Sequence, residues 1–147
     1  MTATNSNQPS HTGHRLLPHT ADVIIEAWAP TRDECLAEAV VALRDSYAEI
    51  VNREVTTRWQ FNLAVAPDCE LLVSLLEEAL YVLDSQTQVP VQAHLEPRPG
   101  GGIAGWFDVA DAADVLPVGS VPKGIARSAL SFAEADGQWR CTVTVDV

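Results

Sequence analysis

Apolar and polar residues alternate most clearly over residues 55–65. A period of two residues predicts a strand with one buried side and one wet side, as in an antiparallel sheet. Its apolar side is predicted to hold Val55, Thr57, Trp59, Phe61, Leu63 and Val65. Residues 91–96 also alternate, and residues 103–109 are predicted to be a strand that forms a hairpin with them across the glycine-rich turn at 97–102. His94 has no evident partner in the sequence, so we interpret it as a surface histidine.

The two ends of the chain are predicted to be strands as well. Residues 23–28 are dense in apolar and β-branched side chains, which favours a strand covered on both faces. Residues 129–135 and 138–147 flank Asp136-Gly137, a dipeptide that type I′ hairpin turns prefer. The last strand keeps its alternation up to Val147. Because free chain ends usually fray, this pattern indicates an end that is docked in the fold.

A first helix is predicted after the strand at residues 23–28. Thr31 and Glu34 have the spacing of a capping box, in which hydroxyl and carboxylate satisfy amide groups of the first turn. Apolar residues then recur at spacings of three and four, which predicts one buried stripe that ends near Val51.

A second helix is predicted after Pro67, with Asp68 as its N-cap. Its buried stripe is predicted to comprise Leu72, Leu75, Leu76, Ala79, Leu80 and Leu83. Glu77, Glu78 and Asp84 fall outside this stripe. A catalytic carboxylate cluster is one interpretation of these three residues, but a solvated helix face is the one that we favour.

This order of elements predicts an α+β fold. Two helices would cover one face of a mixed, mostly antiparallel sheet, which gives a two-layer sandwich. Residues 1–14 are polar and lack periodicity, so we expect a disordered tail before a single domain over residues 15–147. Residues 108–124 form the longest stretch predicted to be irregular, and they contain one lysine, Lys123. A long loop in a compact domain is often functional.

Composition narrows the classes of function. The chain has 20 acidic and 9 basic residues, for a formal charge of −11. Strong nucleic-acid binding needs clustered lysine and arginine, so a basic protein partner or a cation fits better. No apolar run approaches the roughly 20 residues of a membrane span, and no leader pattern is evident, so the expected location is the cytoplasm. Three scattered cysteines predict neither a disulfide framework nor a zinc site.

Hard oxygen donors stand at both ends of the predicted fold. Asp22 precedes the first strand, and Asp146 lies beside the α-carboxylate of Val147. Carboxylates, backbone carbonyls and water are the ligands that calcium and magnesium prefer. Asp146 is predicted to share a polar strand face with Thr142 and Thr144, where a cation can reach it. On chemistry alone, two aspartates so distant in sequence are more often unrelated surface charges than a site.

Four short motifs together give the chain a resemblance to a known family. They are His19-Thr20-Ala21-Asp22, Leu80-Tyr81-Val82-Leu83-Asp84, Lys123-Gly124-Ile125 and Val145-Asp146-Val147. In this order and spacing they resemble archease over nearly the whole chain, from about Arg15. Archeases are small acidic proteins that act as cofactors of the RtcB-type RNA ligase, which joins RNA ends in tRNA splicing and repair.

The resemblance implies both a function and a site. The function is to promote guanylylation of the ligase and to keep it turning over, while the archease itself catalyses nothing. The site is a divalent-metal site, with calcium as the expected metal, at Asp22, Asp146 and the Val147 terminus. Lys123 matches a lysine needed for activation, and His19 is the second residue expected to take part in activation of the partner.

The chain also departs from the family pattern. Ala126-Arg127-Ser128 stands where a Thr–aromatic–His run is usual, Ile24 replaces a glycine, and Ser74-Leu75-Leu76 lacks the usual tryptophan. Two other classes of function therefore stay open. A diverged metal-binding, chaperone-like module would have another protein partner. A metal-dependent hydrolase would use Asp22 and His19 as acid and base.

Overall fold

The computed structural model describes residues 22–51 and 57–147. The predicted tail at residues 1–14, and His19, lie outside the described residues. The elements in chain order are β1 (Asp22–Ala29), α1 (Arg32–Asp45), β2 (Ala48–Ile50), β3 (Thr57–Leu63), α2 (Asp68–Gln86), β4 (Gln88–Pro97), β5 (Ile103–Asp111), a 3₁₀ turn at Ala112–Asp114, β6 (Val115–Pro117), β7 (Gly124–Ala135) and β8 (Gln138–Asp146).

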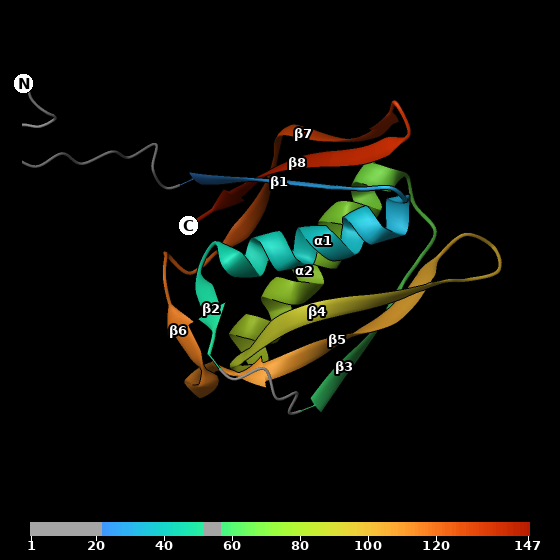
Figure 1. Cartoon of the computed structure of the whole chain (residues 1–147). Helices are drawn as coiled ribbons and strands as arrows, with labels where there is room; N and C mark the ends of the chain where they lie inside the picture. The colour runs from blue at the N-terminus through green and yellow to red at the C-terminus, as the bar shows by residue number, and fades with distance from the viewer. Residues whose placement is uncertain (1–21, 52–56) are drawn as a thin grey trace, which may run out of the picture.

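Two three-stranded sheets enclose the two helices (Figure 1). One sheet has the strand order β1-β8-β7 and the other β3-β5-β4, and β2 and β6 form a small sheet of their own. All of these strand pairs are antiparallel. Helix α1 packs against both β1 and β4, and α2 packs against β7, β4 and β3. The predicted α+β architecture is confirmed, and the structure adds that the strands divide among three sheets.

Strand β1 has one buried side, which corrects the prediction of a strand covered on both faces. Ile25, Ala27 and Ala29 are buried, whereas Ile24 and Trp28 point outwards and are 68% and 52% exposed. A high density of apolar residues does not by itself distinguish a strand with two buried sides from a strand with one buried side and exposed apolar residues on the other. In the neighbouring strand β8, Val143 and Val145 are fully buried as predicted, but Thr144 on the predicted polar face is buried as well, at 8% exposed.

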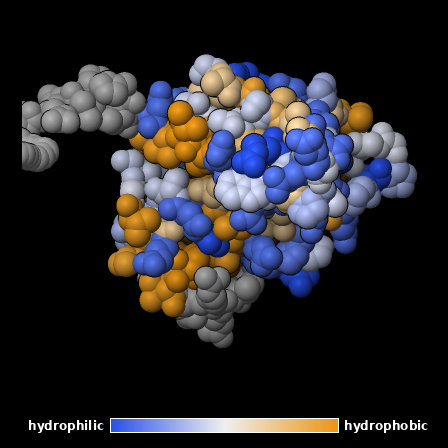
Figure 2. All heavy atoms as spheres, turned by 45° about the horizontal axis from the view of Figure 1, so that its top comes forward, coloured by the Kyte–Doolittle hydropathy of each residue, from blue (hydrophilic) through white to orange (hydrophobic). Residues whose placement is uncertain are grey.

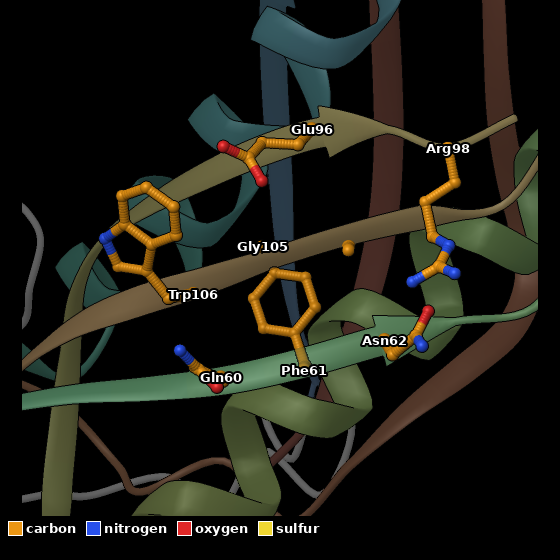
Figure 3. Close-up of a pocket in the computed structure, with 8 residues that line it drawn as sticks. Gln60, Phe61, Asn62, Glu96, Arg98, Gly105 and Trp106 are labelled. Atoms are coloured by element: carbon orange, nitrogen blue, oxygen red, sulfur yellow. The ribbon is translucent and has the colours of Figure 1, made fainter.

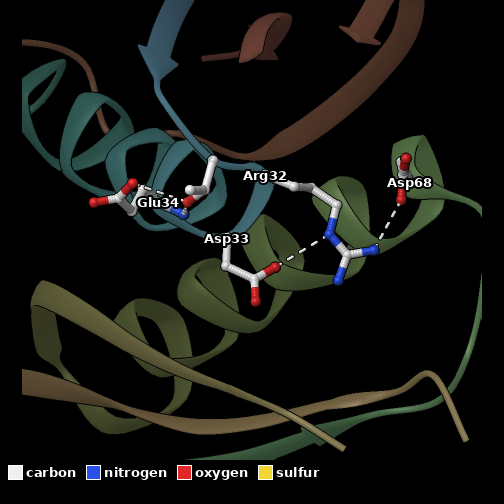
Figure 4. Close-up of polar contacts among 5 residues, drawn as sticks. Arg32, Asp33, Glu34 and Asp68 are labelled. Carbon is white, nitrogen blue, oxygen red and sulfur yellow. Dashed lines mark hydrogen bonds and ion pairs between the residues drawn. The ribbon is translucent and has the colours of Figure 1, made fainter. Parts of the chain in front are cut away.

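The start of α1 shows the predicted N-cap at Thr31, but only the hydroxyl half of the predicted capping box (Figure 4). The Thr31 hydroxyl oxygen accepts the Glu34 amide N–H over 3.1 Å, and the Thr31 hydroxyl donates to the Glu34 carboxylate over 2.9 Å. The first contact satisfies one amide N–H that the first helical turn leaves free, whereas the Glu34 carboxylate accepts from the Thr31 hydroxyl and not from an amide group. Arg32 then links the two helices, because its guanidinium donates both to Asp33 at 3.1 Å and to Asp68 at 3.0 Å.

Helix α2 supplies much of the core. Its buried residues are Leu71, Leu72, Val73, Leu75, Leu76, Ala79 and Val82. The buried face is therefore wider than the predicted stripe, because the helix touches both sheets. Leu80 and Leu83 are only half-buried. The N-cap is Pro67 rather than Asp68, which is the first helical residue.

Two predicted boundaries are wrong for a common reason. Helix α1 ends at Asp45 rather than near Val51, and residues 108–124 are largely regular, since β5 runs to Asp111 and β6 follows the 3₁₀ turn. The short strands β2 and β6 pair with each other, with Glu49 opposite Leu116. Strands of three residues leave no periodic signal, and their pairing depends on contacts that are distant in sequence.

The last hairpin has the predicted turn. Asp136 and Gly137 have φ angles of 56° and 77°, the left-handed values that a type I′ turn requires at both positions. Strand β7 is longer than predicted, because it continues through a bulge at residues 127–130, where the φ angle of Ala129 is 58°. Val147 is partly buried against the core, in accord with a docked end.

Across the described ranges, 22–51 and 57–147, no helix is both long and apolar enough to cross a membrane.

Candidate functional site

Asp22 and Asp146 lie opposite each other where the two ends of the described chain meet. They are Cα partners in the antiparallel pair of β1 and β8. Opposed residues in such a pair project from the same side of the sheet, with Cα atoms about 4.5–5.5 Å apart. Both side chains are exposed, and Asp22 has the same alternation along β1 as the exposed Ile24, opposite the buried Ile25. We call these two residues the terminal pair.

The backbone of Lys123 is hydrogen-bonded to the terminal pair. Its amide N–H donates to the carbonyl oxygen of Asp146 over 2.7 Å. The next residue, Gly124, opens β7 and is the Cα partner of Asp146 on the side opposite to β1. Asp22, Asp146 and Gly124 therefore form one row across three strands. A methyl group at Gly124 would lie 3.8 Å from a carboxylate oxygen of Asp146, so glycine leaves space beside that carboxylate.

Beside the terminal pair, Lys123 also lines a cavity of about 420 Å³, which we call the lysine hollow. Its walls come from α2 and from the segment before β7. They comprise Glu77, Leu80, Tyr81, Asp84, Val121, Pro122 and Lys123. The lysine motif thus meets the helix motif that ends at Asp84. Three of the four short motifs meet at one end of the molecule. Of the fourth motif, His19-Thr20-Ala21-Asp22, the structure describes only Asp22, which lies at the same end.

The ring of Tyr81 is held in place by the second sheet. It lies against Trp59 of β3, with the ring centroids 5.9 Å apart. The indole N–H of Trp59 donates in turn to the Glu78 carboxylate over 2.7 Å. Glu78 is therefore a partner of a half-buried tryptophan, and its interpretation as a solvated residue was wrong. Glu77 and Asp84 are exposed, as a solvated helix face requires.

The terminal pair suits a hard cation by the type of its donors. Two carboxylates opposed across strands repel each other, and a divalent cation between them would remove that repulsion. In number the donors are too few by themselves. Among residues 22–51 and 57–147, no group of three or more His, Cys, Asp or Glu residues could hold a metal ion. Further ligands would be the α-carboxylate of Val147, water, backbone oxygens or residues outside the described ranges.

Comparison with known proteins decides the family. A model of the archease protein family matches residues 14–147. The chain belongs to the archease family. The probable archease proteins of two Mycobacterium tuberculosis strains, CDC 1551 and H37Rv, are each 40% identical to it over 135 residues, which is 92% of this chain and 75% of theirs.

Solved structures agree with this fold. A crystal structure from Thermotoga maritima, described as an archease and possible chaperone, has a TM-score of 0.65 at 16% identity and covers 94% of this chain and 100% of its own. The solution structure of protein 1598 from Methanobacterium thermoautotrophicum has a TM-score of 0.68 at 14% identity, over 86% and 93% of the two chains. The archease fold is thus retained where the sequence has changed widely.

A second polar constellation lies on the outer face of the β3-β5-β4 sheet. The Trp106 ring stacks on the His94 ring, with the two ring centroids 4.9 Å apart. The Arg58 guanidinium lies 4.7 Å from the centroid of the Trp106 ring. His94 Nε2 is 2.7 Å from the Asp108 carboxylate. His94 therefore has partners that the sequence analysis missed. The hairpin of β4 and β5 was predicted, and its register, which puts His94 opposite Trp106, was the signal that would have found them.

A shallow cavity of about 490 Å³ lies next to Trp106 (Figure 3). Arg98 and Asn62 stand on one side of it, and Glu96, Trp106 and Gln60 on the other. It is wide because Ala104, the residue of β5 between Asn62 and Glu96, has a small side chain. None of the four family motifs contributes to this cavity, so the terminal pair and the lysine hollow remain the candidate site.

Proposed function

We propose that this chain is a non-catalytic protein cofactor that activates an RtcB-type RNA ligase by promoting its guanylylation and multiple turnover. Membership of the archease family supports the proposal. The observation that carries it is the hydrogen bond from the Lys123 amide to the Asp146 carbonyl oxygen. This bond fixes the expected activating lysine beside one of the two expected metal-binding aspartates.

The terminal pair is the proposed position of a divalent cation, with calcium as the expected metal. Asp22 and Asp146 would hold it, and the α-carboxylate of Val147 is the expected third donor. A bound cation would supply a positive charge at the end of the molecule that Lys123 also occupies. His19 belongs to the same motif as Asp22, and its role in activation stays a prediction.

The charge of the chain suits this partner. A ligase that holds RNA needs clustered lysine and arginine, and a chain of formal charge −11 is complementary to such a surface. The chain would dock on the ligase as a protein, without strong nucleic-acid binding of its own. Complementary charge chiefly speeds association, so activation should weaken as the salt concentration rises.

The decisive experiment is a guanylylation and multiple-turnover ligation assay with the RtcB-type ligase of the same organism. Wild-type chain is expected to stimulate both steps, and Asp146→Ala to stimulate neither. Glu134→Ala is a matched control, because it removes an exposed carboxylate of the same sheet near the far hairpin. A wild-type chain that neither binds the ligase nor changes its guanylylation would show that the proposal is wrong.

A chaperone-like module is the second candidate function, because the Thermotoga maritima neighbour is described as a possible chaperone. In that case the chain should suppress aggregation of an unrelated unfolding protein, with or without Asp146. The hydrolase alternative depends on His19, which lies outside the described residues.

A further inference from the structure

An apolar strip borders the lysine hollow. Its members are Leu116 in β6, Val118 just after β6, and Val121 and Tyr81, which line the hollow. They are 50%, 53%, 61% and 55% exposed, in that order. Figure 2 shows apolar side chains gathered on the side of the molecule where β2 and β6 lie in Figure 1, with hydrophilic side chains among them. Large apolar side chains that gather on a surface with polar surroundings are typical of a protein-binding site.

The backbone that carries the strip is fixed at both ends. The Val118 amide donates to the Tyr47 carbonyl oxygen over 3.0 Å, and the Lys123 amide to Asp146 over 2.7 Å. Between them, Gly119 packs so closely on Ser46 that an added Cβ would lie 2.3 Å from the Ser46 carbonyl oxygen. A surface that is already ordered loses little conformational entropy when a partner binds it.

Carboxylates flank the strip on both sides. On one side is the lysine hollow, with Glu77 and Asp84. On the other is a cavity of about 430 Å³ next to Val118, lined by Glu49 and by Asp45, which is paired with Arg44 over 2.8 Å. Within the described part of the chain, Glu49, Glu77 and Asp84 have no ion-pair partner. These carboxylates therefore stay available to cationic groups of a partner.

We propose that the apolar strip is the surface on which this chain docks on its ligase, and that the ligase offers an apolar centre with lysine or arginine on both sides. This inference rests on the function proposed above. An RNA-binding enzyme carries the cationic side chains that the flanking carboxylates require. Lys123 stands at the end of the strip and its amide is bonded to the Asp146 carbonyl, so docking there brings the lysine to the partner at the end of the molecule that holds the terminal pair.

The test is the affinity of the purified full-length chain for the ligase, measured by calorimetry. The double variant Val118→Ser/Val121→Ser removes apolar surface without adding charge, and we expect it to bind about tenfold more weakly or worse. Val65→Ser is the matched control, because Val65 is 67% exposed on the connection between β3 and α2, away from the strip. Its affinity should equal that of the wild type.

Thermal unfolding and calcium titration of each variant separate a docking defect from damage to the fold or to the terminal pair. Weaker binding with unchanged melting temperature and unchanged calcium titration supports the docking surface. If the wild type activates the ligase and the double variant binds as tightly as Val65→Ser, the docking surface is wrong while the proposed function stands. If the wild type itself does not bind, the proposed function fails, and this inference fails with it.

The flanking carboxylates provide an independent readout. Glu77→Gln/Asp84→Asn should reduce the dependence of affinity on salt, because two of the charges that face the partner are removed. The apolar double variant should keep the salt dependence of the wild type. If the apolar double variant lost the salt dependence of the affinity and the carboxylate double variant kept it, the proposed chemistry of the interface would be wrong.

Discussion

Asp22 and Asp146 are opposed residues of β1 and β8, so two carboxylates from distant parts of the sequence stand on the same exposed side of one sheet. No positively charged residue occupies the third strand at this register, where β7 has Gly124. The arrangement concentrates negative charge at a point where a sheet would ordinarily avoid it.

The first prediction follows from that repulsion. In the presence of a chelator, Asp146→Asn should raise the free energy of unfolding by about 0.2–1 kcal/mol, because opposed like charges destabilise a strand pair. With saturating calcium the wild type should instead be the more stable of the two, since only the wild type gains the full stabilisation by the bound ion. Chemical denaturation under the two conditions measures both signs. A variant less stable than the wild type in chelator would count against a repelling pair.

A pair of glycine substitutions tests how closely the strands approach. Gly105→Ala would place a Cβ 2.0 Å from the carbonyl oxygen of His94, so we expect destabilisation of about 3 kcal/mol or more. Gly124→Ala meets only an ordinary contact with Asp146, at 3.8 Å, and should be neutral or stabilising by up to about 1 kcal/mol. Urea titrations of the two variants compare the effects directly, and equal losses would contradict the described packing of β5 on β4.

Lys123 is the only lysine of the chain, which makes it a specific chemical probe. An amine-reactive label should modify Lys123 and the α-amino group alone. Bound ligase should slow modification of Lys123 and leave that of the α-amino group unchanged, because the lysine lies at the proposed docking surface. Mass spectrometry of proteolytic fragments measures both rates. Equal rates with and without ligase would place Lys123 away from the partner.

Two buried thiols predict a pH dependence. Burial raises the pKa of the Cys141 thiol to about 12, from 9.0, and also raises the pKa of Cys35. The unfolded thiols release their protons first, so the free energy of unfolding should fall as the pH rises from about 9 towards 12. Cys141→Ala should flatten this decline. At pH 8, a thiol reagent should react with the partly exposed Cys69 while Cys35 and Cys141 stay protected.

Arg127 is one of the residues that depart from the family pattern. Its guanidinium donates to the Glu70 carboxylate of α2, with 2.6 Å between nitrogen and oxygen. Both side chains are about half exposed, so solvent screens the pair, and Arg127→Ala should cost less than about 1 kcal/mol of stability. A double-mutant cycle with Glu70→Ala measures the coupling. If Arg127→Ala instead abolishes ligase activation at unchanged stability, the residue contacts the partner in place of the usual aromatic–histidine run.

Local patterns predicted those parts of the fold that depend on neighbours in sequence. The N-cap at Thr31 and the turn at Asp136-Gly137 each act over four residues or fewer, and both are confirmed. Period predicted the centre of the buried faces of α2 and β8, but not the extra width that contact with both sheets gives α2, nor the burial of Thr144 in β8. Strands β2 and β6 were missed, because each has three residues and pairs only with the other.

The candidate site was predictable only in part, for the same physical reason. The terminal pair was inferred from the two chain ends and the family resemblance, and its register agrees with that inference. The lysine hollow was not foreseen, because it depends on how α2 packs beside the segment before β7. The hairpin of β4 and β5 was evident from the sequence, but its register was not. The stack of Trp106 on His94 depends on that register.

The strand order β1-β8-β7 has a consequence for how the chain folds. The central strand of this sheet is the last one to be synthesised, and neither β1 nor β7 pairs with the other. Strand β1 therefore cannot pair within its sheet until β8 has left the ribosome. Contacts between such distant segments slow folding, and they leave an apolar strand edge unpaired during translation. The earliest strand of the domain is thus the one exposed longest to wrong partners.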